Sequence, residues 1–176
     1  CSGSPPTWCA TCGGGRASTG GREEEAKDRG RRLIDTVTEA GVETIVVNVA
    51  GCGSSMKEYA VLLRDDPQYA QRAEEFSAKV RDISELLAQV GPVATRHPIP
   101  SRVAYHDACH LRHAQGSHEE PRPLLRAIPG LTVMDIPEDE ICCGAAGITN
   151  FVQPPPPAAP RRRSVAQLLP TPPAAY

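Results

Sequence analysis

The chain has 176 residues, a net charge of −2 and only 4% aromatic residues. This composition argues against binding to nucleic acid or to an anionic membrane surface, because both need positive charge and single strands also need stacking side chains. Apolar runs stay well short of the roughly 20 residues of a membrane-spanning helix. The start of the chain is polar and rich in glycine and proline, unlike a signal peptide. Seven cysteines, an odd number, favour a reducing compartment and metal binding over a disulfide framework.

Hydrophobic periodicity predicts helices and strands in alternation. The predicted helices cover residues 23–40 and 67–90, with shorter ones at 54–64 and from His110 onward. The predicted strands cover residues 44–49, 102–106 and 131–136. Gly41 is expected to end the first helix, and Ser54 or Ser55 to begin the second after a loop at 51–53. This order predicts an α/β fold with a mostly parallel sheet flanked by helices.

Three regions are expected along the chain: an irregular flank at 1–21, a cysteine-rich domain at 22–153, and a tail at 154–176. The tail holds eight of the eighteen prolines. Proline at this density prevents regular helices and strands, so we expect the tail to be disordered. Both flanks look like a GC-rich gene read out of frame, and we interpret the ends, not the middle, as aberrant.

Cys142 and Cys143 stand side by side and are followed by Gly144. Neighbouring Cα atoms lie about 3.8 Å apart, closer than a relaxed disulfide prefers, so the pair is better suited to holding a soft metal or a cluster. Gly144 permits a turn that aims both sulfurs the same way. The alternative reading is a pair of small buried apolar residues, since cysteine is often buried.

Three cysteine blocks carry a family resemblance. They are Asn48-Val49-Ala50-Gly51-Cys52-Gly53-Ser54, Ala104-Tyr105-His106-Asp107-Ala108-Cys109-His110-Leu111 and Ile141-Cys142-Cys143-Gly144-Ala145-Ala146-Gly147. In order and spacing they resemble the cysteine-rich CCG-domain proteins, above all the iron-sulfur subunit of bacterial glycolate oxidase. Lactate-utilisation and heterodisulfide reductase subunits are the alternatives within the family. The likeness runs from about residue 23 to about residue 154.

The resemblance implies a duplicated CCG domain, of which this chain is a fragment, and a 4Fe–4S-type cluster at each motif. Cys109, Cys142 and Cys143 match ligands of the second motif, while Cys52 matches the last ligand block of the first. The last cysteine block of the second motif has no counterpart here, so the ligand set is expected to be incomplete. We expect Cys52, Cys109, Cys142 and Cys143 to bind metal and Gly144 to shape the cofactor site.

Histidines and zinc offer different readings of the same residues. His106 and His110 flank Cys109, so either could ligate a metal or hydrogen-bond a cluster sulfur. Zinc sites usually bring cysteines as closely spaced pairs. Only Cys9 and Cys12 have that spacing, and they lie in the flank. A zinc- or thiol-based binding module without a redox role therefore stays open as the alternative function.

By resemblance, the chain is expected to relay electrons from a flavin-containing glycolate or lactate dehydrogenase subunit toward quinone. It would be a subunit of an oxidoreductase and not its flavin-bearing catalytic chain, and no catalytic residue is assigned. We expect a cytoplasmic protein without a transmembrane segment, held at the inner face of the membrane through its complex.

Overall fold

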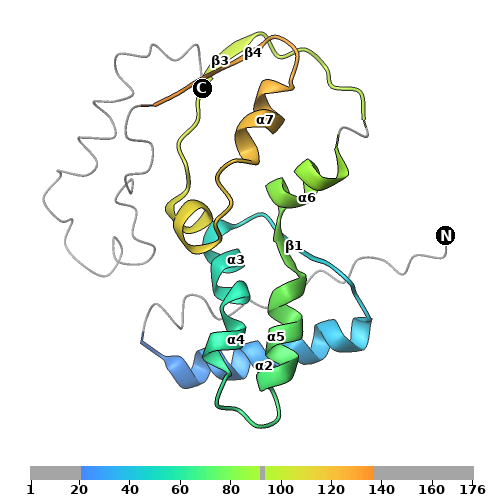
Figure 1. The fold of residues 1–176 in the computed structure, drawn as a ribbon, viewed down its shortest axis with the longest axis vertical. Coiled ribbons are helices and arrows are strands. Elements are labelled where there is room, and N and C mark those ends of the chain that lie inside the picture. Colours follow the sequence, from blue (N-terminus) through green and yellow to red (C-terminus); the bar gives the residue numbers. More distant parts are fainter. Residues whose placement is uncertain (1–20, 92–93, 137–176) are drawn as a thin grey trace, which may run out of the picture. The chain divides into compact units, whose positions relative to one another are not determined.

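The computed structural model describes residues 21–91 and 94–136 (Figure 1). In chain order its elements are α2 (Glu23–Ala40), β1 (Ile45–Val47), α3 (Ala50–Lys57), α4 (Tyr59–Leu62), α5 (Ala70–Lys79), β2 (Val80–Asp82), α6 (Ile83–Val90), β3 (Ser101–Ala104), the π-helical turn η1 (His110–Ala114), α7 (Pro121–Arg126) and β4 (Leu131–Met134). The chain divides into two compact units. Of the described residues, unit 1 comprises 21–43 and 55–79, and unit 2 comprises 44–54, 80–91 and 94–136. Within the described ranges, no helix is both long and apolar enough to cross a bilayer.

Helix α2 of unit 1 covers the residues that the sequence predicts. Its first turn carries three glutamates, which suit the positive end of the helix dipole. Lys27 lies 2.8 Å from Glu23, one turn earlier, which adds an ion pair along the helix. The helix ends at Gly41, whose φ of 62° is in the left-handed region and whose N–H donates to the carbonyl of Thr38.

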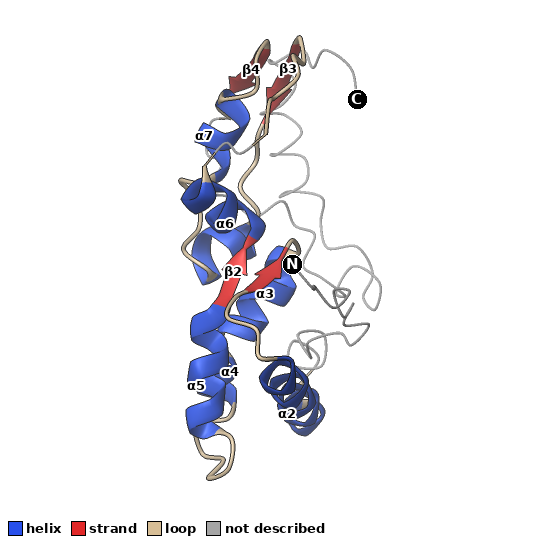
Figure 2. Ribbon diagram, turned by 90° about the vertical axis from the view of Figure 1, so that its right-hand side faces the viewer, coloured by secondary structure: helices blue, strands red, loops and turns tan. Residues whose placement is uncertain are grey.

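The core of unit 1 is apolar and lies between helices. Helix α5 contacts both α2 and α4, and all three appear together in Figure 2. The rings of Tyr59 and Phe76 stack with centroids 5.2 Å apart. Gly30 of α2 packs beside the ring of Tyr59, and a Cβ there would make an ordinary contact with it at 3.6 Å. The apolar side chains buried in this unit are Ala26, Leu33, Ile34, Met56, Tyr59, Leu63, Ala73 and Phe76.

Unit 2 contains the strands, and every strand pairing in the described residues is parallel. Strand β1 pairs with β2 in the register Ile45↔Val80, and β3 pairs with β4 in the register Ser101↔Leu131. The α/β class with parallel strands is therefore confirmed. The strands form two separate two-stranded sheets, whereas one sheet was expected.

The predicted helix over 67–90 is wrong in its middle. Helix α5 ends at Lys79, β2 follows at once, and α6 begins at Ile83. The reason is local: the Asp82 side chain accepts from the N–H of Ser84, and the Glu85 side chain accepts from the N–H of Asp82. This capping box starts a new helix, and the preceding residues extend into a strand whose Val80 is fully buried.

The loop expected at 51–53 is also wrong, because these residues belong to α3. Helix α3 begins at Ala50, and the N–H of Gly53 already donates to the carbonyl of Val49. Ser54 does not begin the helix; its hydroxyl donates back to the carbonyl of Gly51. The predicted strands are each shorter than expected, and the short helix expected from His110 is the π-helical turn η1.

Candidate metal-binding site

Cys52 lies just beyond the carboxyl end of β1, in the first turn of α3. Its thiol is half-buried and is not in a disulfide. Ligand sites of parallel α/β structures form beyond the carboxyl ends of strands, and a helix N-terminus favours negative charge nearby. The position therefore suits a thiolate ligand.

Cys109 occupies the corresponding place after β3. It lies five residues beyond Ala104, the last residue of β3, as Cys52 lies five beyond Val47, the last residue of β1. This thiol is also half-buried and outside any disulfide. Its Sγ lies 3.6 Å from Nδ1 of His110, the next residue in the chain.

Gln115 joins the segments that carry the two thiols. Its Nε2 donates to the carbonyl of Ala50 at 2.8 Å. A Cβ placed on Gly53 would lie only 2.7 Å from that same nitrogen. Gln115, which directly follows η1, therefore lies against the first turn of α3, next to the residues on both sides of Cys52.

A buried carboxylate that the sequence analysis missed holds the Cys109 segment. The Asp107 side chain is only 2% exposed and accepts from Arg112 at 2.6 Å and from Arg122 at 2.9 Å. The Arg122 guanidinium also lies over the ring of Tyr105, 5.2 Å from its centroid. Burial, and then the negative charge of Asp107, raise the pKa of Tyr105. An aspartate two residues before a cysteine was visible in the sequence, but Arg122 is too far along the chain for spacing to reveal the pairing.

A second buried polar network joins the start of α6 to the residues after η1. Asp82 accepts from both the N–H and the hydroxyl of Ser84, at 2.9 and 2.6 Å. Glu85 accepts from the hydroxyl of Ser117, which is almost fully buried. The segment on the carboxyl side of Cys109 is thus tied to α6 as well as to α3.

Cys142, Cys143 and Gly144 lie outside the described residues, so their predicted roles remain predictions. Within 21–91 and 94–136, no group of three or more cysteine, histidine, aspartate or glutamate side chains is placed to hold a metal. The described part contributes two thiols, Cys52 and Cys109. Cysteine thiolates are the main ligands of iron–sulfur clusters, so these donors fit such a group.

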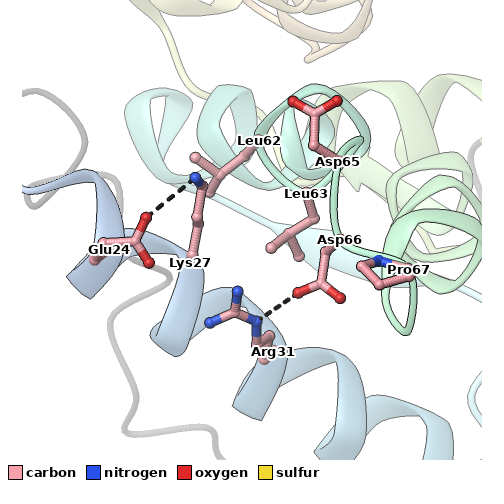
Figure 3. Close-up of a pocket in the computed structure, with 8 residues that line it drawn as sticks. All are labelled: Glu24, Lys27, Arg31, Leu62, Leu63, Asp65, Asp66 and Pro67. Carbon is pink, nitrogen blue, oxygen red and sulfur yellow. Dashed lines mark hydrogen bonds and ion pairs between the residues drawn. The ribbon is translucent and has the colours of Figure 1, made fainter.

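A charged pocket of unit 1 has different chemistry. It lies between α2 and the loop that joins α4 to α5 (Figure 3). Its charges pair internally, Lys27 with Glu24 at 3.2 Å and Arg31 with Asp66 at 2.8 Å. No thiol lines it, so it does not serve as a candidate metal site.

Comparison with known proteins gives a family match and several relatives. The CCG cysteine-rich domain family matches residues 5–57 and 103–172, more than half of the chain. A probable glycolate oxidase iron-sulfur subunit of Bacillus subtilis (strain 168) is 33% identical over 144 residues, covering 81% of this chain and 32% of the relative. Lactate utilization protein A of Exiguobacterium sp. is 31% identical, covering 82% of this chain and 59% of the relative. The glycolate oxidase iron-sulfur subunit of Escherichia coli (strain K12) is 34% identical, covering 75% of this chain and 33% of the relative.

The chain spans about a third of the glycolate oxidase subunits that it matches. No solved structure matches it significantly. The family match extends into both flanks, further than the resemblance over 23–154 had indicated. Its first segment includes Cys52 and its second includes Cys109, Cys142 and Cys143, so each segment carries one set of the cysteines that the sequence singled out. The chain therefore belongs to the CCG cysteine-rich domain family.

Proposed function

We propose that this chain is the iron–sulfur electron-transfer part of a glycolate oxidase-type complex. Lactate-utilisation or heterodisulfide-reductase-like complexes are the alternatives within the family. The observation that carries the proposal is the repeated placement of a half-buried thiol five residues beyond a parallel strand. Cys52 and Cys109 share that placement in one unit, and Gln115 packs their segments together.

In this proposal the cysteines are the ligands. Cys109, with Cys142 and Cys143, holds a 4Fe–4S-type cluster, Cys52 belongs to the neighbouring site, and Gly144 leaves room for the turn. A bound cluster supplies one-electron transfer. The protein would hold the Cys109 segment in place, because Arg112 and Arg122 fix Asp107, two residues before Cys109.

The partners follow from the same assignment. Flavin-containing subunits would oxidise the 2-hydroxy acid, and this chain would pass the electrons on toward a quinone. Two relatives are named as a glycolate oxidase subunit and a lactate utilization protein, which supports this class of partner. We further propose that the complex lies in the cytoplasm at the inner face of the membrane.

Anaerobic reconstitution of the full chain with iron and sulfide tests this function. We expect broad visible absorption that dithionite bleaches, with iron and acid-labile sulfide in matching amounts, because such clusters are reducible. A parallel sample offered equimolar zinc serves as the control. Stoichiometric zinc with no iron would instead favour a zinc- or thiol-based binding module without a redox role.

A further inference from the structure

Gln115 makes a contact that no cysteine pattern predicts. It follows η1, six residues after Cys109, and its amide reaches α3, 65 residues away in the sequence. Its Nε2 donates to the carbonyl of Ala50, two residues before Cys52. The same nitrogen lies where a side chain on Gly53, one residue after Cys52, would begin. The amide therefore touches the backbone on both sides of Cys52.

The orientation of this amide is fixed by its partner. If the amide were reversed, its carbonyl oxygen would face the carbonyl of Ala50, and two acceptors would meet without a proton between them. In the observed orientation Oε1 is buried and accepts no hydrogen bond within the part of the chain that the structure describes. Burying such an acceptor is unfavourable, so packing alone would favour an apolar side chain here. The hydrogen bond to Ala50 gives the glutamine its specific role.

We propose that Gln115 is a positioning residue that sets the Cys52 turn against the Cys109 segment. This inference rests on the proposed function, in which Cys52 and Cys109 serve neighbouring metal sites. The spacing between the two sites would then depend on one side chain and on the absence of a side chain at position 53. Gly53 would be required for this contact and not for its backbone conformation, since it lies in an ordinary helix.

Amide hydrogen exchange of the apo chain tests the contact without any metal. In the Gln115→Ala variant we expect exchange over residues 48–57 to accelerate by about fivefold, the factor that loss of one typical hydrogen bond gives. The Gln89→Ala variant removes an exposed glutamine of α6 in the same unit and should leave exchange over 48–57 unchanged. Unchanged exchange over 48–57 in Gln115→Ala would overturn the proposal.

The two glycines of the Cys52 turn provide a matched pair. Both lie in α3, where alanine has a higher helix propensity than glycine. A Cβ on Gly51 meets nothing within 4 Å, whereas one on Gly53 meets the Gln115 amide. We expect Gly51→Ala to slow exchange over 48–57 and Gly53→Ala to slow it less, because displacement of the Gln115 amide offsets the gain in helix propensity. Equal slowing by both would contradict the proposed contact.

A double variant and an iron measurement complete the design. Because Gln115→Ala frees the space that the methyl group of Gly53→Ala would need, the Gly53→Ala/Gln115→Ala double variant should exchange no faster than Gln115→Ala alone. Faster exchange in the double variant than in Gln115→Ala alone would count against direct contact. After reconstitution, iron per folded chain should fall about twofold in Gln115→Ala and stay at the wild-type level in Gln89→Ala; equal iron in the two would overturn the positioning role. A wild-type chain that takes up no iron would overturn the proposed function, while the exchange results would still decide whether Gln115 positions the two segments.

Discussion

The two units bury different kinds of side chain. In the described residues of unit 1, the interior is built from apolar groups such as Ile34, Leu63 and Phe76. In the described residues of unit 2, the buried groups include five polar or charged side chains, Ser54, Asp82, Ser84, Asp107 and Ser117, beside apolar ones such as Val80 and Leu111. Both candidate ligands, Cys52 and Cys109, lie in unit 2.

This difference indicates how each unit holds its shape. Apolar burial stabilises unit 1 in proportion to area and tolerates some repacking. A buried polar network is favourable only when each of its groups is paired, but it then fixes particular geometries. Ligand thiols need fixed geometry, and metal binding itself adds to folding free energy. We therefore expect changes in unit 1 to alter stability without altering iron content, and changes in unit 2 to alter both.

The largest loss of stability should come from the core of unit 1. Phe76 is 3% exposed and stacks on Tyr59, so Phe76→Ala should lower the free energy of unfolding by about 4 kcal/mol. Urea unfolding followed by circular dichroism measures this loss, with Phe76→Leu as the milder control. Iron per folded chain should not change. A clear drop in iron at unchanged folded fraction would break the contrast between the units.

A smaller loss, with a different consequence, is expected at Asp107. Removing one partner of a buried ion pair leaves the other uncompensated, so Asp107→Ala should cost about 3 kcal/mol. In Asp107→Ala we expect faster hydrogen exchange over residues 105–122 and less iron per folded chain than in wild type. The control is Asp28→Ala in unit 1. Asp28 also pairs with an arginine, Arg31, at 2.8 Å, but its side chain is 62% exposed. The loss of unfolding free energy in this variant should therefore stay below about 0.5 kcal/mol. Full iron in Asp107→Ala would show that the buried carboxylate does not position Cys109.

The capping box at the start of α6 should contribute less. Asp82→Ala removes the acceptor of the Ser84 N–H and hydroxyl and should cost about 1–2 kcal/mol. Exchange over 83–90 should accelerate, because the first turn of α6 loses its cap. Glu85→Gln keeps one carbonyl oxygen to accept from the Asp82 N–H, and its amide nitrogen can donate to the Ser117 hydroxyl in place of the lost acceptor, so it should cost less than Asp82→Ala. Equal losses in the two variants would rule out the cap as the cause.

The smallest effect is a pH dependence in unit 1. A hydrogen bond from Arg31 is the main cause that lowers the pKa of Asp66 below its ordinary value of 3.8. A depressed folded-state pKa stabilises the fold above the unfolded value, and this stabilisation disappears as pH falls through the folded pKa. Asp66→Asn should therefore be less stable than wild type at neutral pH and should approach it well below pH 3.8. The control is Asp65→Asn, at a side chain that is 92% exposed. The difference in stability between this variant and wild type should not change with pH. If it also disappears at low pH, the pH dependence does not come from the Asp66–Arg31 pair.

Sequence patterns predicted elements whose causes are local. The helix ending at Gly41 and the parallel strands after which Cys52 and Cys109 lie follow from acidic first turns, glycine and β-branched runs. The strand Val80–Asp82 was missed because Val80 continues the helical periodicity of its neighbours, although Asp82 and Glu85 already stood at capping-box spacing. The contacts of Gln115 with Ala50 and of Asp107 with Arg122 could not be predicted, because they depend on how distant segments pack.

The central claim is that specific cysteines of this chain hold an iron–sulfur cluster. Iron and acid-labile sulfide per chain, measured after anaerobic reconstitution of single serine variants, test it most directly. Cys109→Ser, Cys142→Ser and Cys143→Ser should each lose most of the iron, because a hydroxyl is a harder and poorly ionised ligand. Cys1→Ser should keep the wild-type content. Full iron in both Cys142→Ser and Cys143→Ser would contradict the assignment and make the adjacent pair structural.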